Sequence, residues 1–129
     1  MKKTKVLLVD DEADFLDVMR QRVETWDYDV ISQFDPNKAI ELIKEKKVDV
    51  VVVDYMMPLM DGLTFIRTVR GFDRQIPMIM FTAHPDQRAI EGTEKLSISA
   101  FIPKFSSYSD SQSALKTAIG LAEKKLGLK

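Results

Sequence analysis

Residues 49–62 read DVVVVDYMMPLMDG, and this stretch decides the fold. Its four consecutive valines, at positions 50–53, form a short run that is apolar on both faces. Continuous apolar runs of this length are typical of parallel strands that are covered by helices on both sides. Asp54 follows the run directly, so the sequence predicts a parallel strand with a carboxylate at its carboxyl end.

Similar runs lie on either side of this stretch, and helical patterns separate them. The further apolar runs, of which the last is weaker and the second more mixed, are at 6–9, 28–33, 77–81 and 100–102. Apolar residues keep helical spacing within 15–26, 39–43, 63–69, 86–96 and 115–126. Strand and helix therefore alternate five times along the chain. This alternation predicts an α/β fold with a parallel sheet and right-handed crossovers.

Length and composition exclude several classes of protein. The 129 residues suffice for one domain, and 45% hydrophobic with 30% charged residues is ordinary for a soluble globular protein. A formal net charge of -1 argues against dedicated nucleic-acid binding, because that affinity depends on neutralising phosphates. The absence of cysteine and the single histidine exclude disulfide scaffolds and multi-histidine metal sites. No apolar run reaches the length of a signal peptide or a membrane span, so we expect a cytoplasmic protein without a membrane partner.

Polar side chains stand at the ends of four predicted strands. In open parallel sheets the ligand lies beyond the carboxyl ends of the strands, so we expect these side chains to meet at one edge. Taken singly, an acid pair before a helix is typical of a helix cap, and a lone lysine is typical of solvated surface. The set comprises Asp10, Asp11 and Glu12 after the first strand, Asp54 after the third, Thr82 at the end of the fourth and Lys104 after the fifth.

The acidic residues point to a hard divalent cation. Residues 10–17 carry five acids and no base, and crowded carboxylates resist ionisation unless a cation lies among them. Oxygen ligands favour Mg²⁺ or Mn²⁺ over metals that prefer thiolates or imidazoles. Such a site also suits phosphoryl transfer, with Asp54 as the candidate nucleophile because carboxylates form aspartyl phosphates. Thr82 and Lys104 would then hold the phosphoryl oxygens.

Four motifs resemble those of the receiver domains of two-component response regulators. They are VLLVDDE at 6–12, the stretch 49–62 quoted above, MFTA at 80–83 and FIPK at 101–104. The resemblance covers essentially the whole chain and implies one receiver domain over residues 1–129, with no output domain. It also implies a flavodoxin-like, doubly wound sheet of five parallel strands in the order 2-1-3-4-5, with five helices.

The resemblance further implies the phosphoacceptor and the metal ligands. Asp54 would accept a phosphoryl group from a sensor histidine kinase or a histidine phosphotransfer protein. Asp11, Asp54 and the backbone carbonyl of Met56 would bind Mg²⁺ directly, and Asp10 would act through water. Mn²⁺ is the other metal expected to fit.

The remaining implied roles concern signalling. Thr82 and Lys104 would bind the phosphoryl group, and Thr82 with Phe101 would form a switch pair that changes the face of the fourth helix, fifth strand and fifth helix. Met56 and His84, two residues after the phosphoacceptor and after the threonine, would tune the lifetime of the phosphoryl group. A downstream protein or a further output domain would receive the signal.

One departure and one alternative accompany the resemblance. Phe105 follows Lys104 where many receivers have a cis-proline, and a cis bond before another residue costs about 2.5–4 kcal/mol, so we expect a trans bond or a rearranged loop. The alternative is a Mg²⁺-dependent phosphatase of the haloacid-dehalogenase type. Its nucleophile normally ends the first strand in an Asp-x-Asp pattern, whereas here Asp10 and Asp11 are followed by Glu12. We therefore expect a signalling module and not an enzyme that acts on an external substrate.

Overall fold

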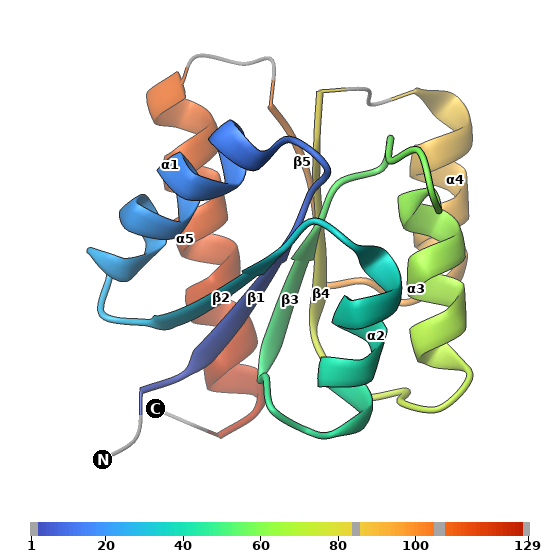
Figure 1. Cartoon of the computed structure of the whole chain (residues 1–129), viewed down its shortest axis with the longest axis horizontal. Coiled ribbons are helices and arrows are strands. Elements are labelled where there is room, and N and C mark those ends of the chain that lie inside the picture. The colour runs from blue at the N-terminus through green and yellow to red at the C-terminus, as the bar shows by residue number, and fades with distance from the viewer. Residues whose placement is uncertain (1–2, 84–85, 105–107, 128–129) are drawn as a thin grey trace.

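A five-stranded parallel sheet organises the chain (Figure 1), and the computed structural model describes residues 3–83, 86–104 and 108–127. The strand order is β2-β1-β3-β4-β5, as predicted. The strands are β1 (Lys5–Val9), β2 (Asp29–Gln33), β3 (Val50–Val53), β4 (Met78–Thr82) and β5 (Ala100–Pro103). The predicted strand at 77–81 begins one residue later, because Pro77 has no N–H to donate to the ladder.

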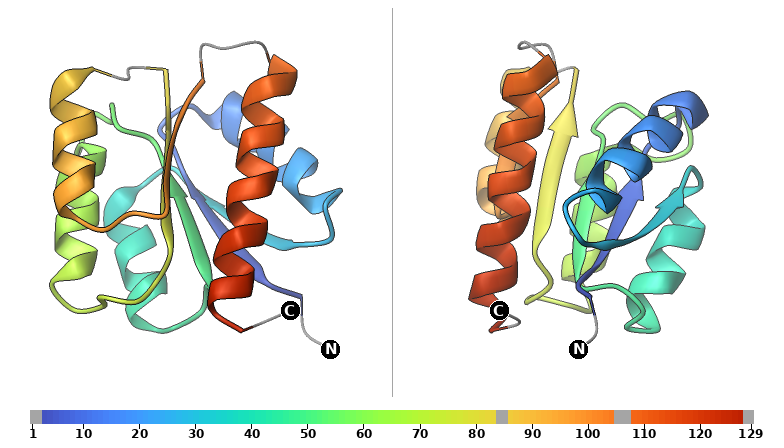
Figure 2. Two further views of the ribbon diagram at one scale, coloured as in Figure 1. Left: turned by 180° about the vertical axis from the view of Figure 1, so that it is seen from behind. Right: turned by 90° about the vertical axis from the view of Figure 1, so that its left-hand side faces the viewer.

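The helices cover both faces of the sheet. Figures 1 and 2 show α1 and α5 on one face and the other three helices on the opposite face. Their bounds are α1 (Ala13–Glu24), α2 (Pro36–Lys44), α3 (Gly62–Arg70), α4 (Gln87–Lys95) and α5 (Tyr108–Lys125). The helical pattern at 15–26 extends two residues past the end of α1 at Glu24. The chain turns soon after, at Asp27, whose φ is 70°.

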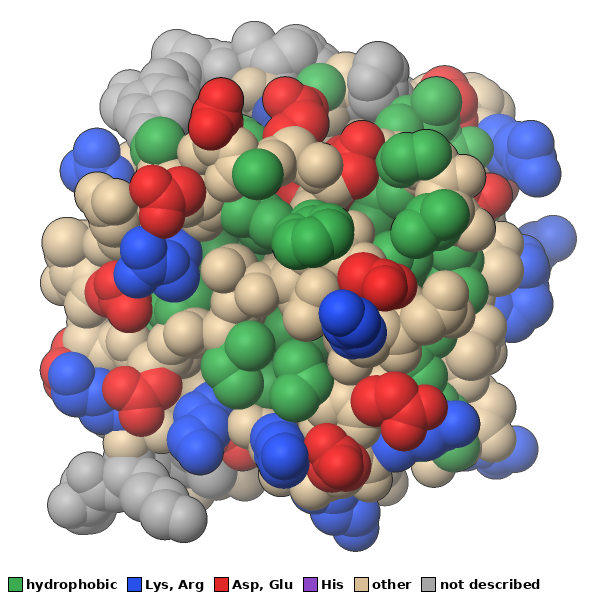
Figure 3. Space-filling view, viewed as in Figure 1, with side chains coloured by type: hydrophobic (Ala, Val, Ile, Leu, Met, Phe, Trp, Pro, Cys, Tyr) green, Lys and Arg blue, Asp and Glu red, His purple; other side chains and the backbone are tan. Residues whose placement is uncertain are grey.

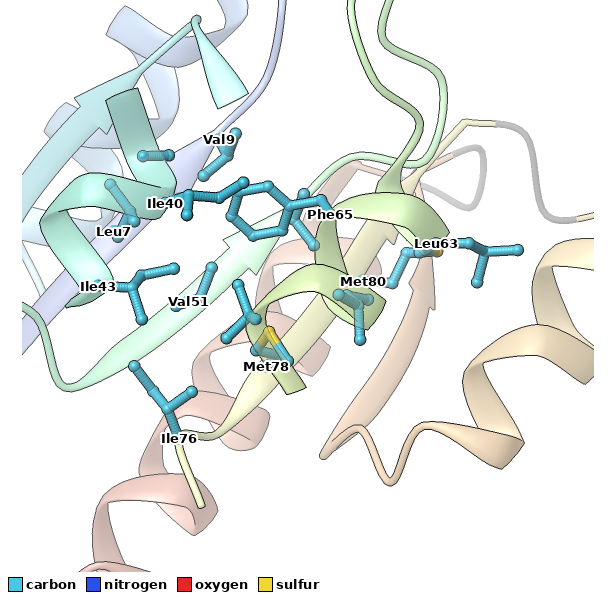
Figure 4. Close-up of a cluster of buried hydrophobic side chains, with 14 of the residues drawn as sticks. Leu7, Val9, Ile40, Ile43, Val51, Leu63, Phe65, Ile76, Met78 and Met80 are labelled. Atoms are coloured by element: carbon cyan, nitrogen blue, oxygen red, sulfur yellow. The ribbon is translucent and has the colours of Figure 1, made fainter. Parts of the chain in front are cut away.

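The strand sequences are apolar throughout because each strand supplies a core on both faces. In β3, Val51 and Val53 pack on the side of α2, α3 and α4, while Val50 and Val52 pack on the side of α1 and α5. Phe65 of α3 is fully buried in the first of these cores, which Figure 4 shows. This two-sided burial explains why the runs lack the alternating polar residues of a half-exposed strand.

The register of the strands brings their carboxyl ends level. Val9 pairs with Val53, and Thr82 pairs with Pro103. The backbone N–H of Asp54 donates to the carbonyl of Val9 at 3.0 Å, and that of Lys104 donates to the carbonyl of Thr82 at 2.7 Å. Residues that follow different strands are therefore neighbours at one edge of the sheet.

Candidate functional site

Three carboxylates meet at this edge. Carboxylate oxygens of Asp10, Asp11 and Asp54 all lie within 4.8 Å of one another. Asp10 and Asp54 are buried, whereas Asp11 is exposed. In the space-filling view, several acidic side chains gather near the top, where the strands end (Figure 3). The structure thus brings together three of the four acids predicted at the strand ends, whereas Glu12 is the exposed N-cap residue of α1.

The start of α1 shows that Asp10 and Asp11 do not cap this helix. The N-cap residue is Glu12, and its side chain makes no capping hydrogen bond. Oδ1 of Asp10 accepts a hydrogen bond from the backbone N–H of Glu12 at 3.0 Å, which turns the rest of the carboxylate toward the strand ends. The ordinary explanation of the acid pair as a helix cap is therefore wrong.

Asp54 is held by the loop that follows β3. Its Oδ1 accepts the backbone N–H of Tyr55 at 2.8 Å. The loop returns so closely that a Cβ at Gly62 would lie 2.5 Å from the carbonyl oxygen of Asp54, and the N–H of Gly62 donates to the carbonyl of Tyr55 at 2.7 Å. Glycine at this position is therefore required by backbone contact, and it fixes the strand end that carries Asp54.

Lys104 approaches two of the three carboxylates. Its ammonium nitrogen lies 2.6 Å from Oδ2 of Asp10 and 3.8 Å from Oδ2 of Asp54, with 11% of the Lys104 side chain exposed. The closer partner is Asp10, so the lysine is paired with the neighbour of the candidate nucleophile more tightly than with the nucleophile itself. At 3.8 Å the ammonium is nevertheless within reach of any group bound on Asp54.

Burial raises the pKa of Asp54, and the negative charge of Asp10 raises it further. The charge of Lys104 and hydrogen bonds from the Thr82 side chain and the Tyr55 backbone lower the same pKa, but burial is the largest of these effects. The site as a whole is short of positive charge, since three carboxylates face one ammonium among the described residues. This electrostatic imbalance favours a cation.

The set of oxygen donors fits a hard divalent ion. Three carboxylates that share a space of this size match the ligand preference of Mg²⁺ and Mn²⁺, and the exposure of Asp11 leaves the site open to solvent on one side. Asp11 and Asp54 are placed to hold such an ion. The backbone carbonyl of Met56 remains the predicted third ligand.

The other predicted residues lie around this cluster. Thr82 is fully buried at the end of β4, and Met56 is half exposed two residues after Asp54. Phe101 is partly buried against the core on the α2–α4 side, as strand alternation predicts. His84 and the Lys104–Phe105 peptide bond lie outside the described residues.

The sequence did not single out Phe15. Its helical spacing places it with the core residues of α1, against which it does pack, and its ring centroid also lies 3.8 Å from the ammonium nitrogen of Lys104. An aromatic residue one turn after an acid pair is a weak signal, because the same spacing is typical of ordinary core packing.

All helices in the described part of the chain are too short or too polar to cross a bilayer.

Comparisons with known proteins agree with this fold. The chain is 37% identical over 86 residues to the probable transcriptional regulator ycf27 of Porphyridium aerugineum. The aligned region covers 67% of this chain and 35% of that protein. It matches the receiver domain of the Francisella response regulator 1452 with a TM-score of 0.83 at 27% identity, covering 95% of this chain and 98% of that one. A receiver domain protein from Clostridium thermocellum gives 0.85 at 23% identity, covering 97% and 98%, and supports the fold alone.

The fold and the site together define a class of protein: parallel α/β domains with an acidic site at the carboxyl edge of the sheet. A family model described as the response regulator receiver domain matches residues 6–116. The chain therefore belongs to the response regulator receiver domain family, whose members are signalling modules of two-component systems. It spans about a third of the length of the curated relative that it matches.

Proposed function

We propose that this chain is a phosphorylation-dependent switch that accepts a phosphoryl group on Asp54. The observation that carries the proposal is the meeting of a buried Asp54 with Asp10, Asp11 and Lys104 at one edge of the sheet. A buried carboxylate with adjacent acids and an ammonium 3.8 Å away is suited to receive a phosphoryl group.

Oδ2 of Asp54 is the proposed attacking atom. Oδ1 already accepts the Tyr55 N–H, whereas Oδ2 is the oxygen on the Lys104 side. An oxygen–phosphorus bond forms at Oδ2 as the phosphorus–nitrogen bond of a phosphohistidine donor breaks, and the donor imidazole leaves with its electron pair. Lys104 offsets charge on the phosphoryl oxygens, and Thr82 donates a hydrogen bond to one of them.

Mg²⁺, or Mn²⁺, is the proposed cofactor, held by Asp11, Asp54 and the carbonyl of Met56, with Asp10 acting through water. Such an ion, when bound, reduces the repulsion between the carboxylates and an incoming phosphoryl group. Asp10 also keeps a second task in the proposal, because its Oδ2 is the resting partner of Lys104 at 2.6 Å.

The proposed signal leaves the site through Thr82 and Phe101. Thr82, whose side chain already donates a hydrogen bond to Asp54, would move further toward the phosphoryl oxygens and vacate space beside β5. Phe101 is partly buried on the α4 side of the sheet, so its ring would rotate into that space. The face formed by α4, β5 and α5 would change as a result, with Ile90 of α4 already 40% exposed there.

The proposed partners are a donor and a receiver of the signal. A sensor histidine kinase or a histidine phosphotransfer protein supplies the phosphoryl group, and a downstream protein or a further output domain responds to the changed face. We propose one receiver domain over residues 1–129, acting in the cytoplasm without direct nucleic-acid or membrane binding. The proposal makes Asp54 and not Asp10 the nucleophile, which is the opposite of the phosphatase alternative.

Labelling with acetyl phosphate in the presence of Mg²⁺ tests the proposal. Asp54→Asn should abolish the acid-labile phosphate, because the amide is nearly isosteric but a poor nucleophile, while circular dichroism shows a retained fold. Asp61→Asn is the matched control: Asp61 caps α3 through the Thr64 N–H at 2.8 Å, and asparagine caps equally well. Undiminished labelling of Asp54→Asn would refute the assignment.

A further inference from the structure

Two aromatic rings lie against the Lys104 ammonium. The nitrogen is 3.8 Å from the centroid of the Phe15 ring and 5.7 Å from that of the Phe81 ring. The two centroids are 6.1 Å apart, with the ring planes tilted by 34°. Because 11% of the Lys104 side chain is exposed, the rings stand where water would otherwise solvate part of the charge.

The elements that carry the rings are fixed by packing. Phe15 lies in the first turn of α1 and packs against the core on that side of the sheet, and Phe81 is a buried residue of β4. Phe15, Asp10 and Asp54 border a cavity of about 10 Å³, which at most approaches the volume that one water needs. Phe15 therefore borders, together with both carboxylates, a space that is almost filled, and its ring lies against the ammonium.

We propose that Phe15 is a positioning residue for phosphoryl transfer, which rests on the proposed function of Asp54. Its ring face holds the Lys104 ammonium beside Asp54 while the lysine changes partner from Asp10 to the phosphoryl oxygens. The ring face is electron-rich and attracts a cation without requiring a particular N–H direction. The ammonium can thus turn its donors toward a new acceptor without leaving the ring.

A phenyl ring suits this task better than an acidic side chain would. A fourth carboxylate, at the place of Phe15, would retain the ammonium by a directed hydrogen bond and would repel an incoming phosphoryl group. An aliphatic side chain would fill the space but offer no attraction, so the lysine would remain on Asp10, where it lies at 2.6 Å. The ring supplies attraction without competing for the donors.

Binding of beryllofluoride at saturating Mg²⁺, followed by NMR, is the test. Phe15→Leu should weaken binding about fivefold, and Phe15→Trp, which keeps an aromatic face, should restore it. Phe34→Leu is the matched control, since Phe34 is 63% exposed beyond β2 and has no place in the proposed machinery. It should bind beryllofluoride as the wild-type protein does.

A double-mutant cycle separates attraction from packing. On a Lys104→Gln background, Phe15→Leu should have no further effect, because the cation is gone. An equal loss in both backgrounds would reduce Phe15 to a packing residue and overturn the inference. If Phe15→Leu does not fold, 3,4,5-trifluorophenylalanine at this position keeps the shape, weakens the ring face and should weaken binding; unchanged affinity would overturn the inference.

The same experiment distinguishes failure of the inference from failure of the proposed function. Wild-type binding that Asp54→Asn abolishes, together with wild-type affinity in Phe15→Leu, removes the role of Phe15 and leaves Asp54 as phosphoacceptor. A wild-type protein that does not bind beryllofluoride, or an Asp54→Asn variant that binds it equally well, contradicts the proposed function and this inference together.

Discussion

Aspartates stand near the N-termini of α1 to α4, but those before α1 serve a different purpose. Asp35, Asp61 and Asp86 each accept a backbone N–H of the helix that follows, at 2.8–2.9 Å, and so cap α2, α3 and α4. Asp10 and Asp11 precede α1, which has no side-chain cap. Helix α1 thus lacks a side-chain cap, and the two aspartates that precede it lie in the acidic cluster with Asp54. An acid at this edge is a functional candidate when it does not cap a helix.

Removing an acid before α1 should have the largest effect on metal binding. We expect Asp11→Ala to weaken Mg²⁺ binding at least about tenfold, because a direct ligand and a negative charge are lost together. Asp10→Ala should weaken it less, since Asp10 acts through water. Calorimetric titration measures both, and equal Mg²⁺ affinity in wild type and Asp11→Ala would contradict the difference between the two kinds of aspartate.

Removing a capping acid should change stability and leave the metal site intact. Asp35→Ala should lower the free energy of unfolding by about 1 kcal/mol, because the Asn37 N–H loses its acceptor at 2.9 Å. Asp35→Asn keeps an acceptor and should retain most of that stability. Urea denaturation measures the loss, and a changed Mg²⁺ affinity in Asp35→Ala would show that the two regions are not independent.

Met56 and His84 should affect the lifetime of the phosphoryl group more than they affect stability. Met56 is half exposed, so its apolar side chain should hinder an attacking water without orienting it. We expect Met56→Asn and His84→Ala each to change the dephosphorylation rate. The factor should be larger than the factor by which each variant changes the equilibrium constant of unfolding. Decay of radiolabelled protein gives the rate, and unchanged rates in both variants would defeat this prediction.

A buried acid at the opposite end of the sheet gives the smallest expected effect. Glu123 accepts hydrogen bonds from the hydroxyls of Thr4 and Tyr28. Burial, followed by the charge of Glu123, raises the pKa of Tyr28 above its ordinary value of 10.0. The folded protein therefore keeps this proton at a pH where the unfolded chain loses it. The resulting stability is fully present below pH 10 and is lost as the pH rises through the folded-state pKa.

Tyr28→Phe should remove this part of the alkaline destabilisation. Denaturation at pH 9 and pH 11 measures it, because groups other than Tyr28 titrate in both proteins and cancel in the comparison. Equal loss of stability with pH in wild type and Tyr28→Phe would show that this tyrosine is not linked to folding.

The sequence predicts the strands and the acidic edge because both depend on local patterns. Val50–Val53 are buried on two faces, so their apolar run is long enough to be read directly. Asp54 follows that run by one residue, and parallel strands in register bring it beside Asp10. These inferences need strand ends alone and no side-chain geometry.

Geometry that depends on side-chain direction could not be predicted in this way. The sequence offers capping as the ordinary explanation for Asp10, and nothing in the residue type reveals that Glu12 occupies the cap position instead. Lys104 lies 94 residues from Asp10 along the chain, and its choice of Asp10 over Asp54 depends on how its side chain lies at the end of β5. The place of the Phe15 ring likewise depends on its contacts with Phe81 and Lys104.

The central claim is that Asp54 carries the phosphoryl group, and chemical trapping tests it most directly. Borohydride reduces an acyl phosphate, so it marks the modified residue after incubation with acetyl phosphate and Mg²⁺. Trypsin separates the candidates, because Asp10 and Asp11 fall within residues 6–20 and Asp54 within residues 48–67. We expect reduction at Asp54, identified by tandem mass spectrometry. Reduction at Asp10, Asp11 or Asp61, or none under conditions that saturate Mg²⁺, would contradict it.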